Sequence, residues 1–521
     1  MKKTWGLAIL SGLLFTLAWP SRGFPLLIFL AWIPLFMLSD EFLEKKKRAL
    51  FWRVYVTFFI FNLLITYWIW FATPVGAVTA VFVNSLLMAL VFLLWHWSRT
   101  RIPPKMYWPL LVVLWISFEK VHHVWDFEWP WLSMGNVFAS WPWMVQWYEF
   151  TGMFGGTLYV MVANIMLYHA WERKSRSGLM KSMAFILIPL IISLVIYKTY
   201  EEKGIEVKVA VLQPNVDPWS EKFNRSNREA LQELFSLLPD TLNLVDLVLA
   251  PETALPAGME KDKSRFQNIQ AQINRFLQDR QYKSMLTGAT LYQFHFGKDI
   301  PLTAIPTRKR GVFYTLYNSA FLFQPDTSYQ LYNKSILVVG AEKMPYHRFL
   351  SPLLGDIVLD LGGASGTHTP SPEPVVFKVE NTEIRVAPII CYESVFGDYV
   401  RKYVEKGANL LAVITNDGWW KKTGGYRQHF DYARLRAIEN RRDVVRSANT
   451  GKSGHINQKG EVVQALEFNK KGLLVVMPRL NNETTFYTRY GDYVARIAGF
   501  LAVLLLLYTV FNKKFKILLS T

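Results

Sequence analysis

Residues Ile384–Ser394 read IRVAPIICYES. The apolar, β-branched part of this stretch predicts a buried strand over Ile384–Ile390. The strand ends on Cys391, the one cysteine among 521 residues, so no intramolecular disulfide can form. Loops that leave strand ends often carry catalytic side chains, because the strands fix their positions. A lone cysteine is otherwise a small buried hydrophobe, so its neighbours must decide between these two interpretations.

Two other reactive side chains are expected at strand ends. Glu252 follows a strand predicted over Leu244–Ala250, and Lys334 stands in a loop-entry position. Together with Cys391 they form a complete set for acyl transfer. The Glu252 carboxylate can take the thiol proton, the Lys334 ammonium can stabilise the thiolate and the oxyanion, and the thiol can attack a carbonyl carbon. Because a nearby ammonium lowers the pKa of a thiol, we expect Lys334 to favour the thiolate.

The region around these residues alternates short β-branched runs with polar stretches of helical spacing. Strands are expected over Val207–Leu212, Leu244–Ala250, Ser284–Thr290, Ala320–Phe323, Ile384–Ile390 and Leu410–Thr415. Helices are expected over Asn224–Leu238, Lys263–Arg280, Val395–Lys406 and Gln428–Asn440. The order predicts a mixed α/β domain with several buried strands.

The rest of the chain holds apolar runs long enough for membrane helices, which need about 20 residues. Candidates lie at 5–19, 24–39, 54–72, 77–97, 107–123, 157–171, 183–198 and 494–511. The first run lacks a small-residue cleavage site, which favours a retained helix over a secretory signal. We therefore expect an α-helical transmembrane bundle of eight spans, divided as a seven-helix region at 1–200, a catalytic domain at 201–490, and a last helix and tail at 491–521.

Basic residues orient this bundle, because short loops rich in Lys and Arg stay in the cytoplasm. The alternate loops at 40–53, 98–106 and 172–182 are rich in them, whereas the loops at 20–23, 73–76 and 126–156 hold only Arg22. Both termini are therefore expected in the cytoplasm and the α/β domain outside it. This topology explains the net charge of +18 better than nucleic-acid binding, which would gather basic residues on one face.

The outside loop at 126–156 is unusually aromatic. Amphipathic rings prefer the headgroup level of a bilayer, so the loop is either an ordinary aromatic belt or the floor of a lipid-binding site. Its aromatic residues include Trp129, Trp131, Trp141, Trp143, Trp147 and Tyr148.

Several motifs, taken together, resemble those of the apolipoprotein N-acyltransferases, a membrane-embedded branch of the nitrilase or carbon-nitrogen hydrolase superfamily. The motifs are Trp129–Leu132 after a helix with Glu119, Leu212–Asn215, Ala250–Glu252, Tyr332–Lys334, Ile390–Ser394, Thr415–Trp420 and Arg434–Glu439. The resemblance implies a nitrilase-type αββα sandwich on eight membrane helices, with Glu252, Lys334 and Cys391 as the catalytic triad.

The same resemblance implies three supporting residues. Glu342 matches the second glutamate of nitrilase sites, although the family often has Pro-Phe-Gly-Glu where this chain has one residue more at 338–342. Tyr392 and Glu393 match an activity-linked pair, or else they are a turn-closing aromatic and a helix-start carboxylate. The family tryptophan after the first strand is replaced by Phe223 or shifted to Trp219.

The implied reaction transfers an acyl group from a membrane phospholipid, such as phosphatidylethanolamine, to the α-amine of the diacylglyceryl-cysteine of a bacterial apolipoprotein. A thioester on Cys391 would link the two halves, shielded from water by the loop near 340–366. The implied protein is a monomer of the inner membrane with a periplasmic catalytic domain, and it needs no nucleic acid.

No cofactor or metal is expected, because the nine histidines form no H-E-x-x-H spacing, and the glycine-rich stretch at 362–366 lacks a P-loop lysine. The alternative function is a membrane-tethered nitrilase-type amidase or acyltransferase that acts on another substrate. A transporter with a degenerate domain is disfavoured, because its ionisable groups should lie within the spans.

The charge pattern of the loops generates a test of topology. Alkaline phosphatase fused after Asn224 should be active, because it folds only outside the cytoplasm, and a fluorescent protein fused after Lys514 should fluoresce, because that tail is expected inside. Activity and fluorescence measured in whole cells check both sites. The reverse pattern would contradict the orientation.

Overall fold

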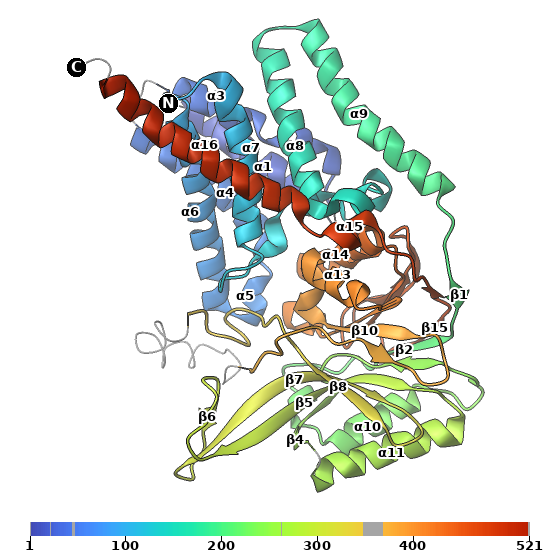
Figure 1. The fold of residues 1–521 in the computed structure, drawn as a ribbon. Helices are drawn as coiled ribbons and strands as arrows, with labels where there is room; N and C mark the ends of the chain where they lie inside the picture. Colours follow the sequence, from blue (N-terminus) through green and yellow to red (C-terminus); the bar gives the residue numbers. More distant parts are fainter. Residues whose placement is uncertain (1, 21, 44–46, 262, 347–367, 519–521) are drawn as a thin grey trace. The chain divides into compact units, whose positions relative to one another are not determined.

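The chain forms two compact units, drawn in Figure 1. The computed structural model describes residues 2–20, 22–43, 47–261, 263–346 and 368–518. One unit comprises Met1–Trp70, Pro74–Thr199 and Tyr490–Thr521, and the other comprises Phe71–Thr73 and Tyr200–Arg489. The expected division at 1–200, 201–490 and 491–521 stays a prediction about independent domains. The stretch at 362–366 and most of the loop near 340–366 lie outside the described residues.

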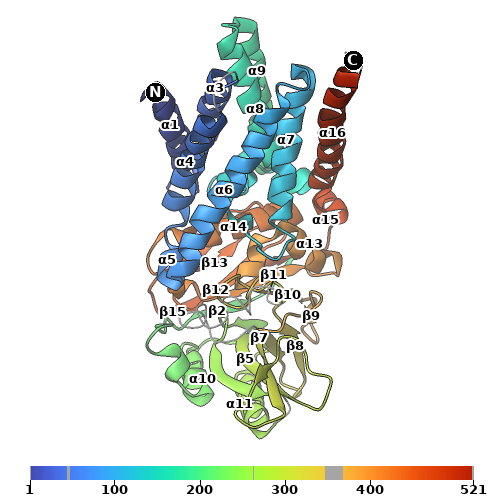
Figure 2. The same cartoon turned by 90° about the vertical axis from the view of Figure 1, so that its left-hand side faces the viewer.

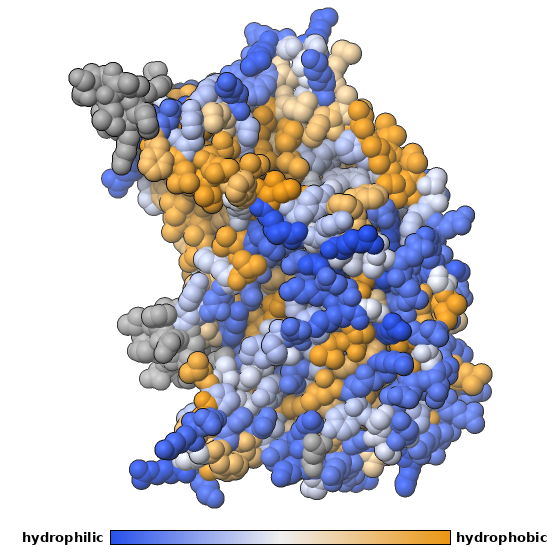
Figure 3. Space-filling model, in the orientation of Figure 1, coloured by the Kyte–Doolittle hydropathy of each residue, from blue (hydrophilic) through white to orange (hydrophobic). Residues whose placement is uncertain are grey.

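The first unit consists of helices that run alongside one another (Figure 2). They are α1 (Lys2–Ala18), η1 (Pro25–Leu27), α2 (Ile28–Ala31), α3 (Ile33–Glu41), α4 (Lys47–Thr66), α5 (Ile69–Ala72), α6 (Pro74–Ser98), α7 (Pro104–Val121), α8 (Tyr148–Glu172), α9 (Arg176–Thr199) and α16 (Tyr493–Leu518). The short helix α15 (Phe486–Tyr490) belongs to the second unit except for its last residue. Apolar residues gather over the first unit on the face shown in Figure 3. Many are exposed, including Ile188, Ile191 and Val195 of α9 and Phe500 and Val503 of α16, as expected of helices that contact lipid.

Five of the described helices are long and apolar enough to cross a membrane, whereas the sequence predicted eight spans. The five lie at Arg48–Thr66, Pro74–Ser98, Tyr148–Glu172, Arg176–Thr199 and Tyr493–Asn512. The other three candidates fall short for separate reasons. Helix α1 has only 17 residues, residues 25–41 are broken into three short pieces, and α7 carries Lys105, Glu119 and Lys120.

The aromatic loop is folded rather than extended. It contains three short 3-10 helices, η2 (Pro130–Leu132), η3 (Met134–Phe138) and η4 (Pro142–Met144). Trp131 and Tyr148 are almost fully buried, and only Trp143 among the loop's tryptophans is exposed. Buried Glu119 anchors the loop, because its carboxylate accepts hydrogen bonds from the Met134 backbone N–H at 2.8 Å and the Thr157 hydroxyl at 2.7 Å. The choice between aromatic belt and lipid-binding floor stays open.

Two sheets form the centre of the second unit. The first contains β15 (Gly472–Val476), β2 (Val209–Gln213), β3 (Leu247–Leu249), β5 (Met285–Phe296), β7 (Val312–Phe323) and β6 (Ile305–Pro306) in that order, with β4 (Leu255–Glu260) on β5 and β8 (Tyr329–Asn333) on β7. The second has the order β14 (Val462–Leu466), β13 (Ser453–Ile456), β12 (Val444–Ala448), β11 (Leu410–Thr415), β10 (Arg385–Ile390) and β9 (Phe377–Lys378). A separate pair joins β1 (Ile205–Glu206) to β16 (Arg479–Leu480).

Helices cover the outer face of each sheet, so the unit has four layers (Figure 1). Helices α10 (Asn227–Ser236) and α11 (Ser264–Arg280) pack on the first sheet, and α13 (Gly397–Glu405) and α14 (Gly424–Asn440) pack on the second. The facing sides of the two sheets share one hydrophobic core, in which Val211, Leu249, Ile389 and Val413 are almost completely buried. This arrangement is the predicted αββα sandwich.

The predicted strand over Leu410–Thr415 has those bounds in the structure, and the other expected strands and helices occur with shifted ends. The largest errors are β5 and β7, which pair over 12 residues each where only their buried halves were predicted. The exposed halves carry polar and aromatic residues in an order that lacks the apolar–polar alternation by which a strand is predicted. Strands β12 to β15 were missed.

Leu411 tests the core of the sandwich. It is fully buried in the middle of β11, so Leu411→Ala should lower the free energy of unfolding by about 2–5 kcal/mol through lost burial and a cavity. Thermal unfolding of the detergent-solubilised protein, followed by near-UV circular dichroism, measures the effect. Leu302→Ala is the control, because Leu302 is 89% exposed and should change stability by less than about 0.5 kcal/mol. Equal effects would contradict the assignment of Leu411 to the core.

Candidate active site

Cys391 lies where β10 ends and the short helix η6 (Cys391–Val395) begins. Its backbone φ of 52° is in the left-handed region, which a non-glycine residue adopts only when its surroundings enforce it. Two contacts fix the Cys391 carbonyl: the Ser394 hydroxyl donates to it at 2.8 Å, and His429 Nε2 lies 3.0 Å away. The turn therefore presents the thiol from a fixed point at the end of the strand.

A buried polar cluster supports this turn from behind. His429 Nδ1 lies 2.9 Å from Asp417 Oδ1, and the Arg446 guanidinium donates to Asp417 Oδ2 at 2.7 Å. Although burial alone would raise it, the positive charge of Arg446 and the contact with His429 lower the pKa of Asp417 to about 2. Burial and Arg446 lower the pKa of His429, so a neutral imidazole stands between an ion pair and the Cys391 carbonyl.

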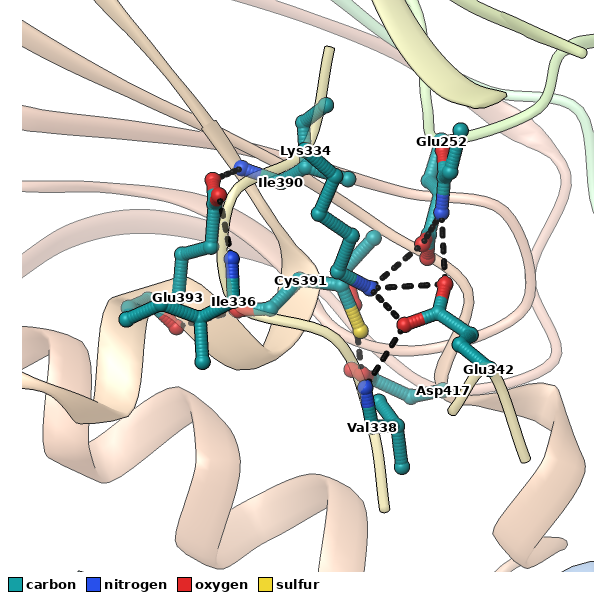
Figure 4. Close-up of polar contacts among 12 residues, drawn as sticks. Glu252, Lys334, Ile336, Val338, Glu342, Ile390, Cys391, Glu393 and Asp417 are labelled. Atoms are coloured by element: carbon teal, nitrogen blue, oxygen red, sulfur yellow. Dashed lines mark hydrogen bonds and ion pairs between the residues drawn. The ribbon is translucent and has the colours of Figure 1, made fainter. Parts of the chain in front are cut away.

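Lys334 follows β8 and is the centre of the site (Figure 4). Its side chain is 1% exposed, and its ammonium contacts Glu342 Oε2 at 2.8 Å and Glu252 Oε1 at 3.4 Å. The Cys391 sulfur lies near the same ammonium (Figure 4). The structure thus brings Glu252, Lys334, Cys391 and Glu342 together, as the resemblance implied, and the extra residue in the 338–342 segment does not displace Glu342.

Asn318 of β7 holds the two carboxylates in place. Its side-chain amide donates to Glu252 Oε1 at 2.7 Å and to Glu342 Oε1 at 2.9 Å. The Val338 backbone N–H donates to Glu342 Oε2 at 2.8 Å. The backbone of Glu252 passes so close to Gly288 that a Cβ at position 288 would lie 2.7 Å from the Glu252 Cα. These contacts leave the Glu252 carboxylate little freedom.

The charges of the cluster support one another. Although burial alone would lower it, the Glu342 and Glu252 carboxylates hold the pKa of Lys334 above its ordinary value. Burial alone would raise the pKa of Glu342, but the Lys334 ammonium keeps the pKa of that carboxyl below its ordinary value. Near neutral pH the Lys334 ammonium and the Glu342 carboxylate are therefore both charged.

Lys334 lowers the pKa of the Cys391 thiol, as expected, but it does not make the thiolate the resting form. Burial raises the pKa of the Cys391 thiol, the Glu252 carboxylate raises it further, and the Lys334 ammonium only partly offsets them. The cysteine therefore rests as a thiol, so a role as a nucleophile would require a nearby base to take its proton. Glu252, beside the same ammonium, is placed to take it.

Glu393 and Tyr392 are both buried. The Glu393 carboxylate accepts hydrogen bonds from the Tyr332 hydroxyl at 2.5 Å, the Ser335 backbone N–H at 2.7 Å and the Ile390 backbone N–H at 2.8 Å. Burial raises the pKa of Glu393 to about 7. The carboxylate therefore ties the start of η6 to the segment after β8, which agrees with a structural role. Tyr392 packs edge-on against Phe396, and a direct role for it stays a prediction.

Both candidates for the family tryptophan reach the same aromatic neighbour. The Trp219 ring lies edge-on to Trp419 at 4.9 Å, and the Phe223 ring stacks on Trp419 at 6.0 Å. Both are about half exposed, and the geometry does not separate them. Among the described residues, no group of three or more His, Cys, Asp and Glu side chains could hold a metal ion.

Sequence reasoning missed Asn318, Lys222 and the supporting role of Arg446. Asn318 lies in a long strand whose polar residues look like an exposed face, and Lys222 follows a polar turn where a lysine is normally solvated. Asp417 was part of a quoted motif, but its pairing with His429 and Arg446 depends on contacts 12 and 29 residues away in the chain. Single-sequence patterns give no signal for such pairs.

Comparisons with known proteins agree with this site and fold. Residues 11–166 match the family described as the apolipoprotein N-acyltransferase N-terminal domain, and residues 208–483 match the carbon-nitrogen hydrolase family. An apolipoprotein N-acyltransferase from Chlorobaculum tepidum is 27% identical over 96% of each chain. One from Thermotoga maritima is 26% identical over 95% of this chain and 92% of its own.

Among solved structures, a CN-hydrolase superfamily protein from Xanthomonas campestris has 18% identity and a TM-score of 0.36, covering 52% of this chain and 90% of its own. At that TM-score the fold assignment rests on the family match and on the sheet topology. The two matched families lie on one chain in the order that the full-length relatives share. The chain therefore belongs to the apolipoprotein N-acyltransferases of the carbon-nitrogen hydrolase superfamily.

Proposed function

We propose that the chain transfers a fatty acyl group from a membrane phospholipid, such as phosphatidylethanolamine, to the α-amine of the diacylglyceryl-cysteine that begins a bacterial lipoprotein. The observation that carries the proposal is the Cys391 thiol near a buried Lys334 ammonium that contacts two carboxylates. The names of full-length relatives supply the substrate class. Within this reaction we assign Glu252, Lys334 and Cys391 as the catalytic residues and Glu342, Tyr392 and Glu393 as their supports.

The first half-reaction forms a thioester. Cys391 Sγ attacks the ester carbonyl of the phospholipid while the Glu252 carboxylate takes the thiol proton. The Lys334 ammonium stabilises the oxyanion that develops on the carbonyl oxygen. When the C–O bond to glycerol breaks, the Glu252 carboxyl returns the proton to the leaving alkoxide. The products are a lysophospholipid and the S-acyl enzyme.

The second half-reaction transfers the acyl group to nitrogen. The neutral α-amine of the lipoprotein attacks the thioester carbonyl, and the Glu252 carboxylate takes a proton from the nitrogen. The C–S bond then breaks, the amide forms, and the proton returns from Glu252 to Cys391 Sγ. A site that excludes water would protect the thioester from hydrolysis between the two steps.

The proposed protein is a monomer of the bacterial inner membrane with eight spans, a periplasmic catalytic domain and cytoplasmic termini. Contacts in the helical unit support spans beyond the five apolar helices. Two of the three charges of α7 are compensated, because Glu119 accepts three hydrogen bonds and Lys120 pairs with Asp492 at 2.8 Å. Helix α7 packs against α16, and α1 packs against α4, so both lie within the bundle.

If the thioester forms, the mass of the protein should increase in the presence of phospholipid alone, without any lipoprotein. Wild-type protein incubated with dioleoyl phosphatidylethanolamine in detergent should become heavier by one oleoyl group, and neutral hydroxylamine should remove that mass, because it cleaves thioesters. Cys391→Ala should show no addition. Intact-mass spectrometry measures both. Turnover of lipopeptide by wild-type protein that never gains this mass would contradict the two-step mechanism, and turnover of a small amide without phospholipid would favour an amidase.

Glu252 and Cys391 should behave as one catalytic unit. Loss of the general base in Glu252→Gln should slow acyl transfer by about 10²–10⁴-fold, and Cys391→Ala should remove the covalent route. Because residues that share one step are non-additive, the double variant should be no slower than Cys391→Ala alone. Single-turnover transfer of labelled acyl chains measures the three rates. Multiplied losses would count against a shared step.

A further inference from the structure

Lys222 is a second buried ammonium at the site, and no step described above uses it. It begins the short helix η5 (Lys222–Asn224), which packs on β4 immediately after the Glu252 turn. Lys222 is 4% exposed. Its ammonium donates a hydrogen bond of 2.8 Å to the backbone carbonyl of Glu252. A lysine is rarely buried without an ion pair, so this placement needs an explanation.

The Lys222 ammonium interacts mainly with Glu252 and Cys391. Among the described residues, its ammonium has one hydrogen-bond acceptor and no ion-pair partner. Arg225 and Glu233 line the same small hollow, but they pair with each other. Of the titratable groups around it, Glu252 raises the pKa of Lys222 most, followed by Cys391.

The segment that carries Lys222 is held firmly. The Lys222 backbone N–H donates to the Asp217 carbonyl at 2.9 Å, and the Val216 backbone N–H donates to Asn449 Oδ1 at 3.1 Å. Asn449 follows β12 in the second sheet. The lysine therefore bridges from an anchored loop to the turn that carries the catalytic carboxylate, and its position is fixed relative to both sheets.

We propose that Lys222 is a positioning residue that acts through Glu252, by fixing the Glu252 turn and by supplying the positive charge that balances the second carboxylate of the site. Without it the site has two carboxylates, Glu252 and Glu342, and one ammonium, Lys334. That imbalance would disfavour a thiolate at Cys391. The inference rests on the proposed function in one respect, because it assumes that Glu252 takes the thiol proton.

The charge of Lys222 should be lost at moderately alkaline pH. Burial lowers the pKa of Lys222 to about 8, although Glu252 and Cys391 act in the opposite direction. The ammonium is therefore present below pH 8 and absent above it. Thioester formation by wild-type protein should fall above this pH. Arginine keeps its charge throughout, so Lys222→Arg should not show that alkaline fall.

The experiment uses the single cysteine of the full chain in detergent. Iodoacetamide alkylates the thiolate, so the alkylation rate followed by intact mass reports only on Cys391, with Cys391→Ala as the blank. At pH 7, Lys222→Met and Lys222→Gln should slow alkylation about tenfold, which corresponds to a rise of about one unit in the pKa of the thiol. Lys222→Arg should restore most of the rate. Lys283→Met is the matched control, since it removes an exposed ammonium that pairs with Asp246, and it should leave the rate unchanged.

Two outcomes would overturn the proposal. If Lys222→Gln is alkylated at the wild-type rate, a neutral hydrogen-bond donor suffices at position 222. If thioester formation by Lys222→Arg falls above pH 8 as it does in the wild-type protein, another group causes that fall. Thermal unfolding identifies variants that fail to fold, and in that case Lys222→Arg alone decides. Alkylation needs no lipid, so it tests Lys222 even if the wild-type protein forms no thioester, which would contradict the proposed function instead.

Discussion

Burial of the Lys334 ammonium constrains the whole catalytic unit. Taking an ion out of water costs several kcal/mol unless well-placed partners compensate. Glu342 and Glu252 provide that compensation for Lys334, and Asn318 and the Val338 N–H satisfy the carboxylates in turn. Because these partners come from different segments, the ends of β3 and β8, the middle of β7 and the 338–342 segment must all be correctly placed before any one charge is stable.

The side chains of the site come from both sheets of the sandwich. The first sheet carries Glu252 and Lys334 just beyond strand ends and Asn318 in the middle of β7, and the second carries Cys391 after β10 and Asp417 after β11. The register of β7 against β8 places Ser319 opposite Asn333, and the Lys334 N–H donates to the Asn318 carbonyl at 2.8 Å. A slip of one residue would turn these side chains to the other face. Packing of the sheets thus sets the catalytic geometry.

The sequence was informative where chemistry is local and less so where it depends on distant contacts. Cys391, Glu252 and Lys334 stand beside predicted strand ends, so their convergence could be expected, and the short buried strand over Leu410–Thr415 was predicted with its bounds. The pKa of Cys391 could not be judged, because a nearby ammonium was visible in the sequence but the depth of burial was not. The interruptions at 25–41 also escaped hydropathy, because broken helices remain apolar.

Burial raises the pKa of Cys391. The same burial favours reaction steps that leave the net charge of the site unchanged. With Lys222 included, the side chains of two lysines and two glutamates lie around the Cys391 thiol, whose raised pKa keeps it protonated. In the proposed reaction, transfer of the thiol proton to Glu252 and attack on a carbonyl would convert one carboxylate into a neutral acid and create one oxyanion, so the net charge would stay constant. In a medium of low dielectric constant, a reaction that moves charge between compensated positions avoids the large cost of adding one. A thiolate at rest would leave the same cluster with an uncompensated negative charge, which explains why the proton stays on sulfur until a substrate carbonyl is present to receive the charge.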